Sequence, residues 1–193
     1  MEPLVQDGEA VAIEQEAPGD VAARDMLLDR AMGPRWRKKT SQKIRQGRRP
    51  ADGLAFVARS ADGGLAATVR LWNIEAGIDP FGRPVPALLL GPLAIDPALK
   101  GCGVGAALMR HAIAEAARLG HGAVLLVGDA PYYERFGFTC AKTGAIALPG
   151  PVERERFLAV ELVEGWLDGA AGMVVPTGRY VTKSRVRATA IAA

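Results

Sequence analysis

The sequence predicts a single α/β domain built on a mixed β-sheet with helices on both faces. The chain has 193 residues, which is about the length of one domain, and 49% of them are hydrophobic against 23% charged, as in proteins that bury a real core. Strand and helix patterns alternate along it. A glycine-rich turn lies between a buried strand and an amphipathic helix, and a second buried strand follows, which indicates a right-handed βαβ unit with two neighbouring parallel strands.

The first part of the chain predicts a strand, two helices and a hairpin. The expected elements are a strand over 10–14, helices over about 21–33 and 40–46, and strands over 54–59 and 65–74. Asp20 precedes the first helix and is expected to cap it. The turn at 60–64 (SADGG) joins the last two strands as an antiparallel hairpin.

The apolar run 87–95 (ALLLGPLAI) predicts a central strand that is covered on both faces. Gly91 and Pro92 interrupt it, and because proline has no N–H to donate, we expect a bulge there. Such a break parts the strand from its parallel neighbour at 122–127. The backbone groups of Leu93 and Ile95 then face an open gap, where a ligand with amide bonds can add as a strand.

The loop Lys100–Gly105 (KGCGVG) presents backbone N–H groups at the start of the helix that runs to Gly120. Such groups and the helix dipole favour a phosphate, although a glycine-rich turn taken alone is more often an ordinary helix start. A ligand with amides in one half and a pyrophosphate in the other is coenzyme A. The residues expected to bind it are Leu93, Ala94, Ile95, Lys100, Gly101, Cys102, Gly103, Val104, Gly105 and Ala106.

Two motifs in this order resemble the GNAT superfamily of acyl-coenzyme-A-dependent N-acetyltransferases, in particular its bacterial branch of predicted acetyltransferases. One is the loop from Lys100 to Gly105, where lysine replaces the usual glutamine or arginine. The other is the aromatic pair Tyr132 and Tyr133 followed by Gly137 and Phe138, after which a strand is expected. The matched elements cover residues 10–162. The resemblance implies the GNAT fold, with a bulged, splayed central strand pair, and acetyl transfer from acetyl-CoA to an amine by direct attack.

The resemblance also implies catalytic roles. Tyr133 corresponds to the tyrosine that protonates the leaving sulfur, whereas Tyr132 is expected to pack. Many relatives carry a glutamate on the broken strand, but the run 87–95 holds no carboxylate. Asp129 is the nearest candidate base by topology, with a helix-cap role as its alternative. Glu75, Asp79 and a water-relayed proton remain further alternatives.

The basic residues gather in two segments. Residues 35–49 hold eight of the 24 lysines and arginines and no acid, and four more follow position 178, which leaves 12 basic against 21 acidic residues elsewhere. A solvated helix face with a frayed tail also explains this pattern. The first helices line the acceptor site in the family, so the resemblance implies a small-molecule or peptide amine acceptor that is anionic. The candidate acceptor-binding residues are Lys43, Arg45, Arg70 and Trp72.

Two other functions stay open. One is a catalytically silent module on the same scaffold that binds coenzyme A or, through its basic segments, nucleic acid. The other is a nicotinamide enzyme, because Gly101, Gly103 and Ala106 fit a degenerate dinucleotide fingerprint with Asp129 further on. Five residues separate the preceding strand from the first glycine, whereas that turn follows its strand directly. The second function is therefore disfavoured.

Composition sets the remaining expectations. Cys102 and Cys140 are expected to be free thiols, and with only two histidines no metal site is expected. The densest apolar stretch has nine residues against the ~20 of a membrane span, so no membrane partner is expected and the cytoplasm is the default location. We expect one domain over 1–164 and an extension over 165–193, which packs on the domain or mediates a homodimer.

Overall fold

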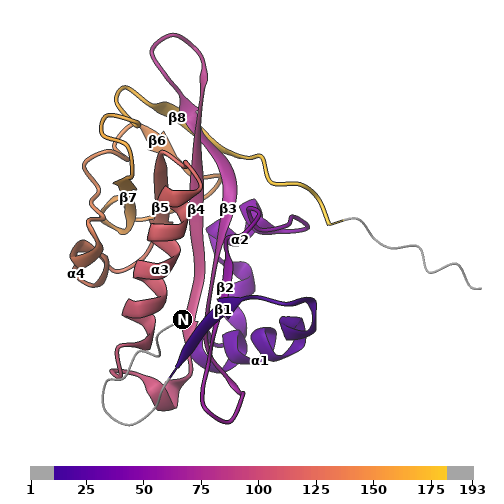
Figure 1. The fold of residues 1–193 in the computed structure, drawn as a ribbon. Coiled ribbons are helices and arrows are strands. Elements are labelled where there is room, and N and C mark those ends of the chain that lie inside the picture. Colours follow the sequence, from indigo (N-terminus) through magenta and orange to yellow (C-terminus); the bar gives the residue numbers. More distant parts are fainter. Residues whose placement is uncertain (1–10, 182–193) are drawn as a thin grey trace, which may run out of the picture.

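The computed structural model describes residues 11–181 and centres on an eight-stranded sheet (Figure 1). The strands are β1 (Ala12–Gln15), β2 (Ala55–Arg59), β3 (Leu65–Ile78), β4 (Pro84–Ile95), β5 (Ala123–Val127), β6 (Ile146–Ala147), β7 (Phe157–Glu161) and β8 (Ala171–Pro176). The α-helices are α1 (Val21–Met32), α2 (Thr40–Arg45), α3 (Val104–Arg118) and α4 (Ala130–Tyr133). The predicted order of strands and helices is therefore confirmed from β1 to β5.

The sheet is mixed and mostly antiparallel. Its main order is β1-β2-β3-β4-β5-β7, with β4 and β5 as the parallel pair at the centre. The long strand β3 pairs with β2 along its first half and with β8 along its second half. The strand β8 lies after residue 164, so this part of the chain packs into the sheet itself.

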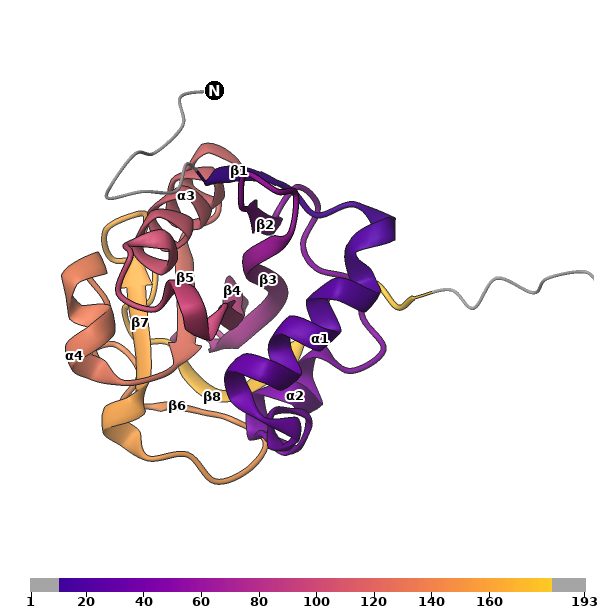
Figure 2. The same cartoon turned by 90° about the horizontal axis from the view of Figure 1, so that it is seen from below.

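Helices cover both faces of the sheet, as predicted (Figure 2). The helix α3 lies on one face and turns a buried stripe toward it, which recurs at helical spacing: Val104, Leu108, Met109, Ala112 and Ala116. The helices α1 and α2 lie on the other face. Leu27 and Leu28 of α1 pack there with Trp36 and with Ala94 of β4.

The predicted bulge at Gly91 is confirmed. Val69 of β3 pairs with Leu93, yet Leu71 pairs with Leu90, so three steps on β4 oppose two steps on β3. Before the bulge Leu90 belongs to the core on the α3 face, and after it Leu93 packs on that same core. The extra residue thus reverses the alternation of side chains along β4.

Two local expectations are corrected. Asp20 directly precedes α1, but its carboxylate accepts hydrogen bonds from the N–H of Ala17 and from Arg59, not from the helix. The strand expected after Phe138 is reduced to a single bridge between Thr139 and Ala159. In both cases a partner distant in sequence or a tight turn decides the backbone, which local propensity does not reveal. Among residues 11–181 no helix is long and apolar enough to cross a membrane.

Candidate active site

The central strands β4 and β5 separate beyond the bulge. Their pairing is limited to Leu88 with Val124 and Leu89 with Leu125. On the other side of β4, Asp96 donates its N–H to Ala66 of β3 at 2.7 Å. Since N–H groups alternate in direction along a strand, those of Leu93 and Ile95 point away from β3, toward the gap. The expected open edge is therefore present.

The loop before α3 leaves backbone donors free at the start of the helix. Gly103 is the residue that precedes α3, and its φ of +78° is one that glycine adopts readily. The first N–H of this region that bonds into the helix is that of Ala107, to the carbonyl of Gly103. Within the described residues, no backbone acceptor meets the N–H groups of Val104, Gly105 and Ala106. An anion is the natural partner for such a set of donors.

Tyr133 lies on the short helix α4, which follows β5, the strand that faces β4 across the gap. Its ring lies against the backbone of Gly128, where an added Cβ would come within 2.1 Å of Cε2. It also packs edge-on against Tyr132 at 4.9 Å and Phe138 at 6.0 Å between ring centres. Burial raises the pKa of Tyr133 to about 12, a shift that Tyr132 supports and nearby Arg156 opposes. The hydroxyl accordingly stays protonated at neutral pH.

The candidate bases lie at different distances from the gap. Asp129 is exposed at the end of β5, and its carboxylate makes no cap bond to α4, so the expected capping interaction is absent. Glu75 pairs with Pro86, five residues before Gly91, which is roughly 17 Å along the strand. The carboxylate of Asp79 is bonded to Arg83 in the hairpin turn beyond Glu75. Of these three carboxylates only Asp129 is near the gap.

A cavity of about 390 Å³ lies beside the bulge, on the face opposite α3. It is bounded by α1, by the segment from Trp36 through α2, and by β3 and Pro92 of β4. Among residues 11–181, Asp25 is the single acidic residue that lines it. Five lining residues are arginines: Arg24, Arg37, Arg45, Arg48 and Arg70. The cavity therefore favours anions over cations.

Three of the four predicted acceptor-binding residues come together at this cavity. Arg70 and Trp72 share a face of β3, with the guanidinium 5.8 Å from the indole ring centre, and Arg45 lies opposite them on α2. The indole N–H of Trp72 donates to the carbonyl of Gly91 at 2.6 Å, which holds the bulge. Lys43 does not line the cavity, because the same helix turns its ammonium group toward Gly150.

The sequence analysis missed Glu16, a carboxylate directly behind this cavity. It follows β1, is 4% exposed, and forms ion pairs with Arg24 and Arg70. Burial raises the pKa of Glu16 to about 7, whereas Arg24 opposes this shift. Arg70 is 54 residues away in the chain, so no local pattern indicates this pairing.

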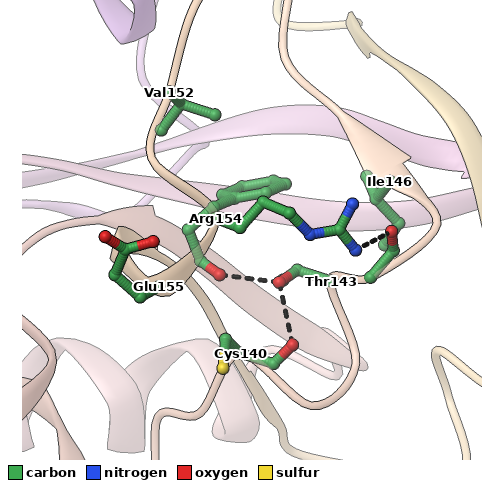
Figure 3. A pocket seen from close by; sticks show the side chains of 8 residues that line it. Cys140, Thr143, Ile146, Val152, Arg154 and Glu155 are labelled. Carbon is green, nitrogen blue, oxygen red and sulfur yellow. Dashed lines mark hydrogen bonds between the residues drawn. The ribbon is translucent and has the colours of Figure 1, made fainter.

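A second cavity, also of about 390 Å³, lies under the loop between Cys140 and Phe157 (Figure 3). The hydroxyl of Thr143 donates to the carbonyl oxygen of Phe157 at 2.6 Å. The same hydroxyl lies 3.1 Å from the carbonyl oxygen of Cys140. The guanidinium of Arg154 donates to Gly144. These polar groups bond to one another and hold the loop together, so this cavity is not the candidate site.

Comparison with known proteins agrees with this geometry. Residues 51–140 match the model of the acetyltransferase (GNAT) domain family. The N-acetyltransferase YhbS of Escherichia coli is 27% identical over 165 residues, which cover 84% of this chain and 93% of that protein.

Two solved structures share the fold. The crystal structure of Escherichia coli YhbS in complex with CoA has a TM-score of 0.71 at 24% identity and covers 90% of this chain and 93% of its own. A GNAT family acetyltransferase from Brucella melitensis in complex with acetyl-CoA has a TM-score of 0.54 at 25% identity, with 78% and 95% covered. The split central strands, the open α3 start and these similarities lead to one conclusion: the chain has the fold of the GNAT N-acetyltransferases, and its residues 51–140 match their acetyltransferase domain.

Proposed function

We propose that this protein transfers the acetyl group of acetyl-CoA to an amine. The observation that carries the proposal is the parting of β4 and β5 beyond Leu89, next to the free donors at the start of α3. Pantetheine amides fit the open edge at Leu93 and Ile95, and the pyrophosphate fits the loop from Lys100 to Ala106. The relatives solved with CoA and acetyl-CoA support this assignment.

In the proposed reaction, the amine nitrogen attacks the thioester carbon and the C–S bond breaks. The N–H of Leu93 donates to the thioester oxygen, where negative charge develops. Tyr133 passes its proton to the leaving sulfur, and the new amide nitrogen loses a proton to Asp129 or to water. An alkyl amine with a pKa near 10.4 is neutral about once in 2,500 molecules at pH 7, a cost of ~4.6 kcal/mol. Positive charges around the cavity disfavour the ammonium form and so lower this cost.

The first test is binding. Isothermal titration calorimetry is expected to show binding of acetyl-CoA and none of NADH. Cys102→Asp places a negative charge in the exposed loop and should raise the dissociation constant for acetyl-CoA at least tenfold. Cys140→Asp is the matched control, since this cysteine is also exposed but lies in the loop of the second cavity. Equal affinity in the two variants would remove the loop from the coenzyme site.

The second test is turnover. Thiol release from acetyl-CoA, measured across classes of amines, should reveal at least one acceptor. Binding of acetyl-CoA without transfer to any amine would favour the silent binding module. Salt-dependent binding of duplex DNA or RNA would then assign the basic segments to nucleic acid.

A further inference from the structure

The arginines around the cavity beside the bulge differ in how their charge is balanced. Arg24 pairs with Glu16 and Asp25, Arg70 pairs with Glu16, and Arg37 pairs with Asp29. Each of these three charges therefore has a carboxylate of the protein itself beside it.

Arg48 and Arg45 have no carboxylate partner within residues 11–181, and they differ in burial. Arg48 donates to the carbonyl of Gly178 and the hydroxyl of Tyr180, and its guanidinium lies 4.2 Å from the centre of that ring. Arg45 is 5% exposed. Its Nε and Nη2 donate to the carbonyl and hydroxyl of Ser41, at 3.1 and 2.9 Å, which leaves Nη1 without an acceptor among the described residues.

The free Nη1 lies at the bulge. A Cβ built on Gly91 would come within 3.1 Å of it, so the guanidinium packs on the backbone of this residue. The backbone nitrogen of Leu93 lies 4.0 Å from the same built Cβ. An anion at Arg45 is thus a few bonds from the position proposed for the reacting thioester.

A buried cation without a counter-ion is costly to the protein, because desolvation is not offset by an ion pair. Burial lowers the pKa of Arg45 to about 10. The pKa of nearby Lys39 is also lowered, first by burial and then by the positive charges of Arg156 and Arg45. The local field is therefore positive, and an anionic ligand would relieve it.

We propose that this cavity binds a carboxylate or phosphate group of a small amine acceptor and that Arg45 is the residue that anchors it. The inference rests on the proposed acetyl transfer and narrows its substrate class. A cavity of about 390 Å³ suits a small molecule. The indole rings of Trp36 and Trp72 supply apolar walls beside the charge.

The test uses matched pairs of acceptors in the thiol-release assay. Amino acids are compared with their carboxamides, and O-phosphoethanolamine with ethanolamine, so that the two arms distinguish carboxylate from phosphate. In the wild type, kcat/KM for the anionic member of at least one pair should exceed that of the neutral member tenfold or more. In Arg45→Gln the ratio of the two kcat/KM values should fall toward one, because the KM for the anionic acceptor rises while the affinity for acetyl-CoA is unchanged. Arg45→Lys should restore part of the ratio.

Arg83→Gln is the matched control, because Arg83 lies in the exposed turn before β4 and pairs with Asp79. The ratio of kcat/KM for the anionic and the neutral acceptor should be the same in Arg83→Gln as in the wild type. Competition on the wild-type protein decides the matter if the Arg45 variants do not fold: acetate or inorganic phosphate, at constant ionic strength, should compete with the acceptor and not with acetyl-CoA.

Two outcomes would overturn the inference while acetyl transfer stands: equal use of charged and neutral amines, or no competition by either anion. If acetyl-CoA does not bind, the proposed function fails instead. Anion binding is then measured alone, as a rise in melting temperature with acetate or phosphate that Arg45→Gln abolishes, Arg45→Lys retains in part and Arg83→Gln retains in full. Absence of that rise would also refute the anion site.

Discussion

Replacing Tyr133 with phenylalanine tests the proposed chemistry most directly. The change removes only the hydroxyl, while the ring keeps its packing against Gly128, Tyr132 and Phe138. General acids contribute ~10²–10⁴ to rates, or about 3–5 kcal/mol. Burial raises the pKa of Tyr133 to about 12, well above the ~8.5 of an ordinary thiol, so the proton passes less readily to sulfur. We therefore expect a fall in kcat of roughly tenfold to a hundredfold, about 1.4–2.7 kcal/mol.

The assay is thiol release at saturating acetyl-CoA, with coenzyme affinity measured separately by calorimetry. Affinity should be nearly unchanged in Tyr133→Phe, because the coenzyme contacts proposed above are made by backbone groups of other elements. Tyr132→Phe is the matched control. Its ring packs between Tyr133 and Phe136, and its hydroxyl lies 3.1 Å from a Cβ built on Gly105, so at saturating acetyl-CoA it should keep its kcat even where coenzyme affinity falls. An unaltered kcat in Tyr133→Phe would remove the hydroxyl from the mechanism.

Four further predictions follow from the same geometry. Gly128→Ala should lower kcat about as much as loss of the Tyr133 hydroxyl, because the new methyl group would overlap the ring; an unchanged kcat would show that the ring position does not matter. Tyr133 donates a proton only below its pKa of about 12, so kcat should not decline between pH 8 and 10; a descending limb centred below pH 10 would contradict this. Acetyl-CoA should protect Cys102 from iodoacetamide and leave Cys140, which is also exposed, reactive, as peptide mass spectrometry would report; protection of neither cysteine would contradict coenzyme binding at the loop. Trp72→Phe should lower the free energy of unfolding, measured in urea, by about 1–3 kcal/mol, because the buried carbonyl of Gly91 loses its donor; a change near zero would show that this hydrogen bond does not stabilise the bulge.

The parts of the fold that follow a local period were predictable. The alternation in 54–59 and 65–74, the apolar run through 87–95 and the stripe on the helix after Gly103 each reflect burial of one or both faces of an element. The bulge was predictable for the same kind of reason, because proline lacks the N–H that the ladder needs. The parting of β4 and β5 followed from it.

The acceptor side was predictable only in part. The clustering of basic residues indicated an anionic partner, but not which charges are balanced. Lys43 and Arg45 lie two residues apart on α2, and the turn of the helix sends one toward Gly150 and buries the other beside Gly91. Glu16 acquires its partners only when β1, α1 and β3 meet.

The sequence by itself determined the order of elements, the interrupted central strand, the glycine loop and the position of Tyr133, because each depends on residues that are neighbours in the chain. The tertiary structure alone decided that Arg45 has no carboxylate partner among residues 11–181, that Glu16 pairs with two other arginines, and that Trp72 holds the bulge. Ion pairs and hydrogen bonds of this kind join groups from different elements. Their partners exist only after the sheet and its helices have packed.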